Sequence, residues 1–236
     1  MKRHIPNMLT LMNLFCALPA LDAASRADFH TTLFWMILSL AFDFLDGLVA
    51  RWLDVATPLG VQLDSLADVV SFGVVPSMVL FKIAVTYVPP ELQLLEIVPY
   101  LSFIVAAGAA FRLARFNLDV DQSKDFKGLP TPSCAILVIG IPFIIEVVGR
   151  EVFQLYHFVI IPFLLIWFMN ADFRLFSLKL SHADSFLWLK GVFVLAAVVI
   201  LVWFKKAGLS AVVLLYILLS ILFYHPTKSI HHEIQS

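Results

Sequence analysis

Charge is scarce in this chain of 236 residues: Asp, Glu, Lys and Arg together make up 14% of it, well below the roughly 25% of a soluble domain. Neither sign dominates, since 16 basic and 17 acidic residues give a net charge of -1, and this balance excludes the basic surface expected for binding nucleic acid. Cysteine occurs only twice, at Cys16 and Cys134, which excludes a disulfide framework and predicts two packing residues. Hydrophobic residues instead make up 61% of the chain, so the sequence indicates a polytopic membrane protein.

The hydrophobic residues fall into eight continuous runs. A helix needs about 20 residues to cross about 30 Å of hydrocarbon, so eight spans would use most of the chain and leave room for short loops. The sequence therefore predicts an all-α membrane helix bundle in one domain, residues 1–224, followed by a cytoplasmic C-terminal tail at 225–236. The predicted spans are 8–24, 31–50, 59–81, 97–116, 133–149, 154–170, 187–204 and 208–224.

The placement of Lys and Arg favours a cytoplasmic N-terminus, because basic residues concentrate in loops on the inner side of a membrane. In this orientation most of them lie inside, four lie outside and Lys82 falls within a span. The inner residues are Lys2, Arg3, Arg51, Arg112, Arg115, Lys124, Lys127, Arg174, Lys179, Lys190 and Lys228. The outer residues are Arg26, Arg150, Lys205 and Lys206. The sequence thus predicts that both ends of the chain are cytoplasmic.

Four aspartates lie close together in the second and third predicted spans: Asp43, Asp46, Asp64 and Asp68. A charge near the bilayer centre costs at least about 2.5–3.5 kcal/mol, so such a group needs a function. The first two are three residues apart and the last two are four apart, so each pair shares one helix face. We therefore expect two acidic faces on neighbouring helices.

The residues around the acids favour convergence of these faces. Gly47 and Gly60 each lie one helical turn from an aspartate and leave space for a ligand against the backbone. Thr57 and Pro58 have the residue types of a helix N-cap and a first helical position. A short inner turn is therefore predicted between the two acidic helices.

Carboxylates a few ångströms apart repel one another unless they are protonated or bound to cations. Oxygen ligands without His or Cys suit Mg²⁺ or Mn²⁺. The four aspartates and Arg51 sum to -3, and two divalent cations would bring the site to +1, a charge that attracts phosphate. Structural ion pairs or a cation pathway are the alternatives, but structural pairing requires neither the glycines nor the excess of acid.

The string from Asp43 to Asp68 resembles, at every fixed position, the signature of the CDP-alcohol phosphotransferases, which are integral membrane enzymes. The resemblance implies a six-helix core and a site facing the cytoplasm. It implies that Asp43, Asp46 and Asp64 bind one divalent cation. It also implies that Asp43, Asp64 and Asp68 bind a second, with Asp68 as the general base for the incoming alcohol.

The same resemblance implies that Gly47, Arg51 and Thr57 contact the CDP portion of the substrate. Asn7 and Thr10 are three residues apart at the inner end of the first span, where they could hydrogen-bond the cytidine or its phosphate. A helix cap at the membrane interface is the alternative for these two residues.

Four further strings, residues 5–16, 64–76, 112–117 and 126–132, resemble the type II phosphatidylserine synthases. The implied reaction joins CDP-diacylglycerol and L-serine to give phosphatidylserine and CMP. The family commonly forms homodimers, and the compact chain suggests the inner membrane of a bacterial cell. Another alcohol acceptor, such as glycerol 3-phosphate or inositol phosphate, is the nearest alternative, and a cation transporter is the alternative from another class.

Serine recognition requires a cation for the carboxylate of serine and polar partners for its ammonium group. Arg112 and Arg115 lie three residues apart at the inner end of the fourth span, with Asn117 nearby, and an arginine fork suits either a carboxylate or a phosphate. Their alternative role is to anchor the span at lipid headgroups. Ser71 lies three residues after Asp68 and could also contact serine. No Ser–His or Cys–His nucleophile pattern is visible, which predicts a single displacement without a covalent intermediate.

Overall fold

The computed structural model describes residues 4–55, 57–118, 126–171, 174–175 and 187–223. Within these residues the chain is almost entirely helical, so the predicted all-α bundle is confirmed. The predicted tail at 225–236 lies outside the described residues, as does part of the polar loop before residue 126.

The α-helices are α1 (His4–Ser25), α2 (Phe29–Leu53), α3 (Pro58–Asp68), α4 (Val75–Val85), α5 (Ile104–Leu118), α6 (Thr131–Val148), α7 (Leu155–Asn170), α8 (Leu187–Phe204) and α9 (Gly208–Phe223). A π-helix, η1 (Val69–Val74), joins α3 to α4 without a break, and a 3-10 helix, η2 (Gln93–Phe103), leads into α5. Short 3-10 turns η3 (Arg150–Val152) and η4 (Lys205–Ala207) precede α7 and α9. Strands β1 (Phe126–Lys127) and β2 (Arg174–Leu175) form a two-residue antiparallel pair.

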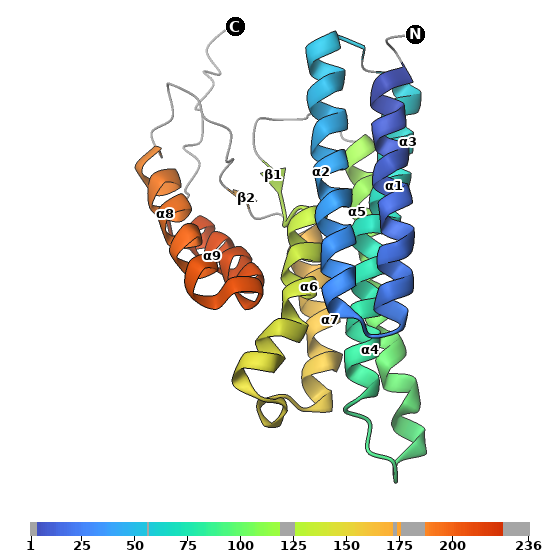
Figure 1. The fold of residues 1–236 in the computed structure, drawn as a ribbon, viewed down its shortest axis with the longest axis vertical. Coiled ribbons are helices and arrows are strands. Elements are labelled where there is room, and N and C mark those ends of the chain that lie inside the picture. The colour runs from blue at the N-terminus through green and yellow to red at the C-terminus, as the bar shows by residue number, and fades with distance from the viewer. Residues whose placement is uncertain (1–3, 56, 119–125, 172–173, 176–186, 224–236) are drawn as a thin grey trace, which may run out of the picture.

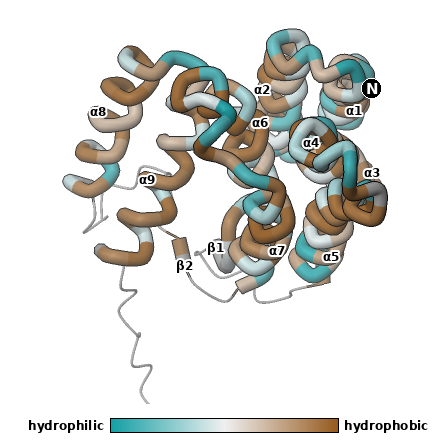
Figure 2. The backbone as a smooth tube through the Cα atoms, turned by 90° about the horizontal axis from the view of Figure 1, so that it is seen from below, coloured by the Kyte–Doolittle hydropathy of each residue, from teal (hydrophilic) through white to brown (hydrophobic). Residues whose placement is uncertain are grey.

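Among the residues that the structure describes, six helical stretches are long and apolar enough to cross a membrane: His4–Ser25, Phe29–Leu53, Pro58–Val85, Leu94–Leu118, Thr131–Val148 and Trp188–Leu222. The last stretch turns back at η4, so that α8 and α9 lie side by side (Figures 1 and 2). Helix α7 has 16 residues and is about 24 Å long, shorter than the hydrocarbon layer. Each of the eight predicted spans coincides with a helix or with consecutive helices. The six stretches that meet the length and composition of a membrane span are fewer, because α7 is too short and α8 and α9 count as one stretch.

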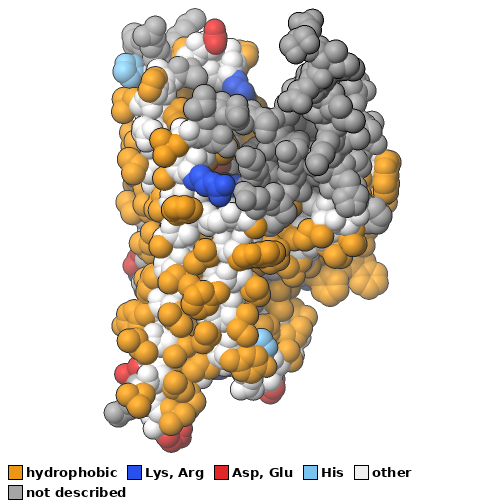
Figure 3. All heavy atoms as spheres, turned by 180° about the vertical axis from the view of Figure 1, so that it is seen from behind, with side chains coloured by type: hydrophobic (Ala, Val, Ile, Leu, Met, Phe, Trp, Pro, Cys, Tyr) orange, Lys and Arg blue, Asp and Glu red, His pale blue; other side chains and the backbone are white. Residues whose placement is uncertain are grey.

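Hydrophobic side chains cover most of the described surface on the face shown in Figure 3. On α8, for example, Trp203 is 80% exposed and Leu195 is 68% exposed. Side chains of this kind are stable at the surface only where lipid replaces water. The exposed apolar surface is therefore that of an integral membrane protein.

Helices α1 and α2 form an antiparallel hairpin that positions the site (Figure 1). Small residues on α1, including Ala17, Ala20 and Ala24, are completely buried, which lets the backbones approach closely. Cys16 on α1 and Cys134 on α6 are both buried free thiols, so the predicted packing role of the two cysteines is confirmed.

Helix α9 packs against α6 at Gly140, and Gly140→Ala is expected to destabilise the protein. A Cβ at this position would lie 2.2 Å from Ser210 Oγ and 2.8 Å from the backbone N of Ser210. The two helices would have to separate, at a cost of about 1–3 kcal/mol, which would lower the thermal unfolding midpoint in detergent. Gly191→Ala in α8 is the matched control, because nothing lies within 4 Å of its added Cβ.

The control variant is expected to gain about 0.5–1 kcal/mol, since alanine is the better helix former. Equal shifts of the unfolding midpoint in Gly140→Ala and Gly191→Ala would contradict close packing of α6 on α9.

Candidate metal and catalytic site

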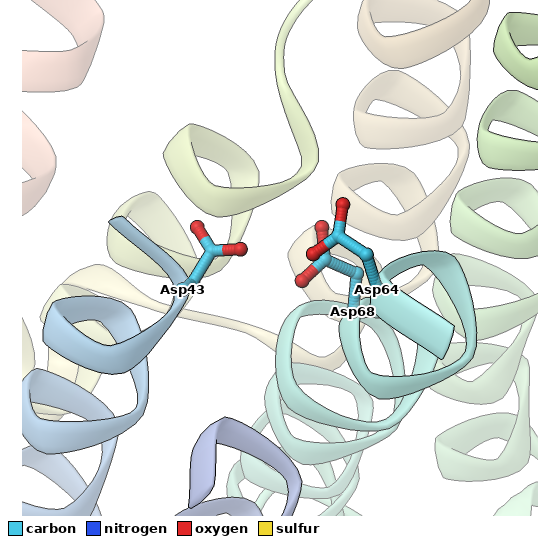
Figure 4. Close-up of side chains that lie close together, drawn as sticks. All are labelled: Asp43, Asp64 and Asp68. Atoms are coloured by element: carbon cyan, nitrogen blue, oxygen red, sulfur yellow. The ribbon is translucent and has the colours of Figure 1, made fainter. Parts of the chain in front are cut away.

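Three carboxylates meet where α2 faces α3. Asp43 comes from α2, whereas Asp64 and Asp68 come from α3, and one oxygen of each lies within 4.8 Å of the other two. Figure 4 shows the three side chains pointing toward one another. The predicted convergence of two acidic faces is confirmed for these three residues.

The three carboxylates lie in partly or fully buried surroundings, and one of their oxygens has no hydrogen-bond partner. Asp68 is only 7% exposed, and Asp64 Oδ1 is buried without a hydrogen-bond partner. The side chains of Asp43 and Asp68 lie within hydrogen-bonding reach of each other. Ionised carboxylates this close repel one another, and either a shared proton or a bound cation would relieve the repulsion.

A hard divalent cation fits these donors. The group contains carboxylates alone, without His or Cys, and oxygen ligands of this kind suit Mg²⁺ or Mn²⁺. A cation bound here would supply the partner that Asp64 Oδ1 lacks and would offset the repulsion among the three charges. Asp43, Asp64 and Asp68 are therefore the residues that could hold a metal ion.

The fourth acid, Asp46, lies outside this group of three. It is 6% exposed, and its Oδ2 accepts a hydrogen bond of 2.6 Å from Thr10 Oγ1 on α1. Its carboxylate still interacts electrostatically with both Asp43 and Asp64. All four acids therefore belong to one charged cluster, within which Asp46 already has a hydroxyl donor.

A tight turn brings the acids together. Helix α2 ends at Leu53, and its C-cap residue Asp54 adopts a left-handed conformation with φ of 51°. Three residues later Thr57 is the N-cap of α3, and its Oγ1 accepts a hydrogen bond of 3.1 Å from the N–H of Gly60. Pro58 occupies the first helical position. The predicted N-cap and short turn are confirmed.

Three of the residues predicted to contact CDP lie beside Gly47 and Gly60. Asn7 Oδ1 lies 3.1 Å from the position of a Cβ on Gly60, and Thr57 Oγ1 lies 3.2 Å from it. Arg51 Nη1 lies 3.3 Å from the position of a Cβ on Gly47. The predicted open space against the backbone is therefore occupied in this structure by the chain's own polar side chains, which a ligand would contact or displace.

Asn13 on α1 joins the site although the sequence pattern did not single it out. Its side chain is completely buried, and its Nδ2 donates a hydrogen bond of 3.3 Å to Asp68 Oδ1. Its Oδ1 accepts hydrogen bonds from Ser39 on α2 and Ser71 in η1. The available signal was its spacing of three residues from Thr10, which places two polar side chains on one face of an apolar helix.

The two candidate arginines of α5 both contact the C-terminal end of α7. Arg112 Nε donates a hydrogen bond of 3.1 Å to the carbonyl of Met169, and Arg115 Nη1 donates one of 3.5 Å to the carbonyl of Asn170. Cationic groups stabilise a helix C-terminus, where carbonyls lack intrahelical partners. Both arginines thus attach α5 to α7.

Ser71 and Asn117 also make contacts between helices. Ser71 is completely buried, and its Oγ donates a hydrogen bond of 2.8 Å to Asn13. Asn117 Nδ2 donates a hydrogen bond of 2.8 Å to Ser65 Oγ on α3. The contact of Ser71 favours a positioning role over direct contact with substrate.

Comparison with known proteins places these features in a family. Residues 3–170 match the family model described as CDP-alcohol phosphatidyltransferase. The chain is 31% identical over 140 residues to the CDP-diacylglycerol–serine O-phosphatidyltransferase of Bacillus subtilis, which covers 59% of this chain and 76% of that protein. For the protein of the same name from Saccharomyces cerevisiae the identity is 36% over 159 residues, covering 61% of this chain and 55% of the relative.

A third relative of that name, from Helicobacter pylori, is 35% identical over 136 residues, covering 57% of this chain and 55% of the relative. The chain therefore spans about half the length of the yeast and Helicobacter relatives.

Proposed function

Because this membrane protein belongs to the CDP-alcohol phosphatidyltransferase family, we propose that it transfers the phosphatidyl group of CDP-diacylglycerol to the hydroxyl of L-serine, giving phosphatidylserine and CMP. The observation that carries this proposal is the group of Asp43, Asp64 and Asp68, with the unpartnered oxygen of Asp64. Serine is the proposed acceptor because the relatives from Bacillus, yeast and Helicobacter are named for it.

The proposed reaction is a single displacement. The serine hydroxyl oxygen attacks the phosphorus that bears the diacylglycerol, and the bond from that phosphorus to the bridging oxygen of CMP breaks. CMP leaves with the electron pair, and Asp68 accepts the proton of the hydroxyl. A positioned general base of this kind contributes about 10²- to 10⁴-fold to the rate.

Two divalent cations, Mg²⁺ or Mn²⁺, are proposed for the cluster. Asp43, Asp46 and Asp64 would hold one of them, and Asp43, Asp64 and Asp68 would hold the second. When bound, the ions would neutralise the pyrophosphate and stabilise the oxygen of the leaving CMP. The hydrogen bond from Thr10 orients the carboxylate of Asp46 for this task.

The substrate contacts are proposed on either side of the aspartates. Asn7, Thr10, Gly47, Arg51 and Thr57 would bind the CDP portion; three of the side chains lie beside the glycines at the turn. This grouping supports a binding site for the nucleotide near the inner end of α1, α2 and α3.

Serine would bind toward α5. The candidates for its carboxylate are Arg112 and Arg115, with Asn117 close by on α5. Ser71 would act through Asn13 rather than touch serine. An arginine fork matches a carboxylate in geometry and charge. The same fork also matches a phosphate, so an acceptor such as glycerol 3-phosphate or inositol phosphate is the second candidate.

The proposed setting is the inner membrane of a bacterial cell, with the site facing the cytoplasm and the protein as a homodimer. Lys206 contacts His30 at the start of α2, so the α8–α9 turn lies near the α1–α2 turn that carries Arg26. The proposed topology requires this proximity, because it places Arg26 and Lys206 on the same, outer side.

Purified protein in detergent, given CDP-diacylglycerol and Mn²⁺, is expected to release CMP at least about 10-fold faster with L-serine than with glycerol 3-phosphate or inositol phosphate. The measurement is CMP release for each alcohol at equal concentration. Faster CMP release with a phosphorylated alcohol would show that this alcohol, and not serine, is the acceptor. A folded protein that releases no CMP with any acceptor would overturn the proposal.

A further inference from the structure

Asn13 connects three segments of the site from a helix that carries none of the four acids. Its side chain is completely buried in the packing of α1. Ser39 on α2 and Ser71 in η1, both also completely buried, reach its Oδ1, and its Nδ2 reaches Asp68 at the end of α3. The amide is therefore fixed by three contacts to three other segments.

The chemistry of the partners determines which way the amide faces. An ionised carboxylate can only accept hydrogen bonds, so it requires the NH₂ group of Asn13 and not its carbonyl oxygen. The two serine hydroxyls can rotate to donate, and both then point at the remaining oxygen of the amide. Ser39 and Ser71 thus stabilise the orientation of Asn13 that suits Asp68.

We infer that Asn13, held by Ser39 and Ser71, is a positioning residue that fixes the rotation of the Asp68 carboxylate beside Asp43 and Asp64. The hydrogen bond occupies Asp68 Oδ1. Oδ2 is then the oxygen that would ligate a cation or accept the proton of the acceptor hydroxyl. This inference rests on the proposed function for its catalytic consequence, but its consequence for cation binding is independent of the alcohol used.

Asn13→Leu removes the amide at similar volume and is expected to weaken Mn²⁺ binding by about 10- to 100-fold, the usual effect of losing a partner that orients a metal ligand. The measurement is a Mn²⁺ titration of the detergent-solubilised protein followed by electron paramagnetic resonance. In turnover, kcat is expected to fall by a similar factor while the KM for CDP-diacylglycerol changes less than about 3-fold.

Ser71→Ala and Ser39→Ala supply a test that leaves Asn13 in place. Each is expected to weaken Mn²⁺ binding by a smaller factor than Asn13→Leu, because one of two donors to the amide remains. The double variant Asn13→Leu/Ser71→Ala should bind Mn²⁺ no more weakly than Asn13→Leu alone, since both changes act through one network. Ser71→Thr keeps the hydroxyl and is expected to restore binding.

Ser77→Ala is the matched control for these variants. Ser77 is a completely buried serine in the same span as Ser71, but its Oγ donates a hydrogen bond to the backbone carbonyl of Gly73. It is expected to leave Mn²⁺ affinity unchanged. If Asn13→Leu folds and binds Mn²⁺ as the wild type does, the inference is overturned; if Asn13→Leu fails to fold, unchanged affinity in Ser39→Ala and Ser71→Ala overturns it.

Failure of the proposed function gives a different pattern. A wild-type protein that releases no CMP with serine, but whose Mn²⁺ affinity falls in Asn13→Leu and not in Ser77→Ala, would overturn the reaction and support the positioning role. Normal CMP release with unchanged Mn²⁺ affinity in Asn13→Leu would overturn the positioning role alone.

Discussion

Asp64→Asn is expected to weaken Mn²⁺ binding by more than about 100-fold, because the substitution replaces a cation ligand rather than a residue that orients one. Asp64 Oδ1 is buried without a hydrogen-bond partner, so a ligated cation would supply the interaction that this oxygen lacks. The asparagine has nearly the same shape but lacks the charge, and one of its two terminal atoms is an NH₂ group that cannot ligate a cation.

The effect on stability has opposite signs with and without the ion. Without divalent cations, Asp64→Asn should raise the thermal unfolding midpoint, since it removes one of the charges that repel one another beside Asp43 and Asp68. With Mn²⁺ at 100 times its dissociation constant, the wild type gains about 2.7 kcal/mol from binding, and the variant should gain almost none. Thermal unfolding with EDTA and with Mn²⁺ measures both effects.

Asp54→Asn is the matched control for this variant. Asp54 is an exposed aspartate at the end of α2, and its left-handed conformation is one that asparagine adopts readily. It should leave Mn²⁺ affinity and its stabilising effect unchanged. Retention of wild-type affinity by Asp64→Asn would show that the three carboxylates do not hold the ion.

The geometry of the acids was predictable because it depends on local rules. Helical periodicity places Asp64 and Asp68 on one face, and the residue types of Thr57 and Pro58 specify where α3 begins. Because the turn between α2 and α3 is short, the face of α2 that carries Asp43 can take few positions relative to α3. The convergence of the three acids in the structure is the result of these local constraints.

The roles of residues on α1 and α5 were harder to predict because they depend on contacts between distant segments. Asn13 touches Ser39 and Asp68, which are 26 and 55 positions away, and no local pattern specifies which face of α1 meets them. Arg112 was assigned to substrate or lipid, but it also binds the C-terminal end of α7, 57 positions away. Which helices pack against each other determines these contacts, and local sequence does not specify that packing.

The π-helix η1 had no sequence signal either. Residues Val69–Val74 follow Asp68 directly, and their apolar composition suits an α-helix equally well. A π-turn shifts the angular relation between the residues before and after it, and such turns are frequent at functional sites. In this chain it lies between the acids of α3 and the apolar packing of α4, and it places Ser71 against Asn13.

Asp68→Asn is expected to lower CMP release by at least about 10²- to 10⁴-fold while CDP-diacylglycerol still binds. The amide cannot take the proton of the serine hydroxyl, so the attack on phosphorus loses its base. The variant should fold, because the Oδ1 of asparagine can accept the same hydrogen bond from Asn13 that the aspartate accepts. The measurements are CMP release and equilibrium binding of CDP-diacylglycerol.

Asp22→Asn is the control, since Asp22 is largely exposed and pairs with Arg26 near the other end of α1. Comparison with Asp64→Asn separates the two roles of the cluster. Asp68→Asn is expected to lose turnover while its Mn²⁺ affinity falls less than that of Asp64→Asn. This result would show that Asp68 transfers a proton in addition to any role as a cation ligand. Near-normal turnover in Asp68→Asn would refute the base assignment. Another carboxylate of the cluster, Asp43, Asp46 or Asp64, would then be the candidate base.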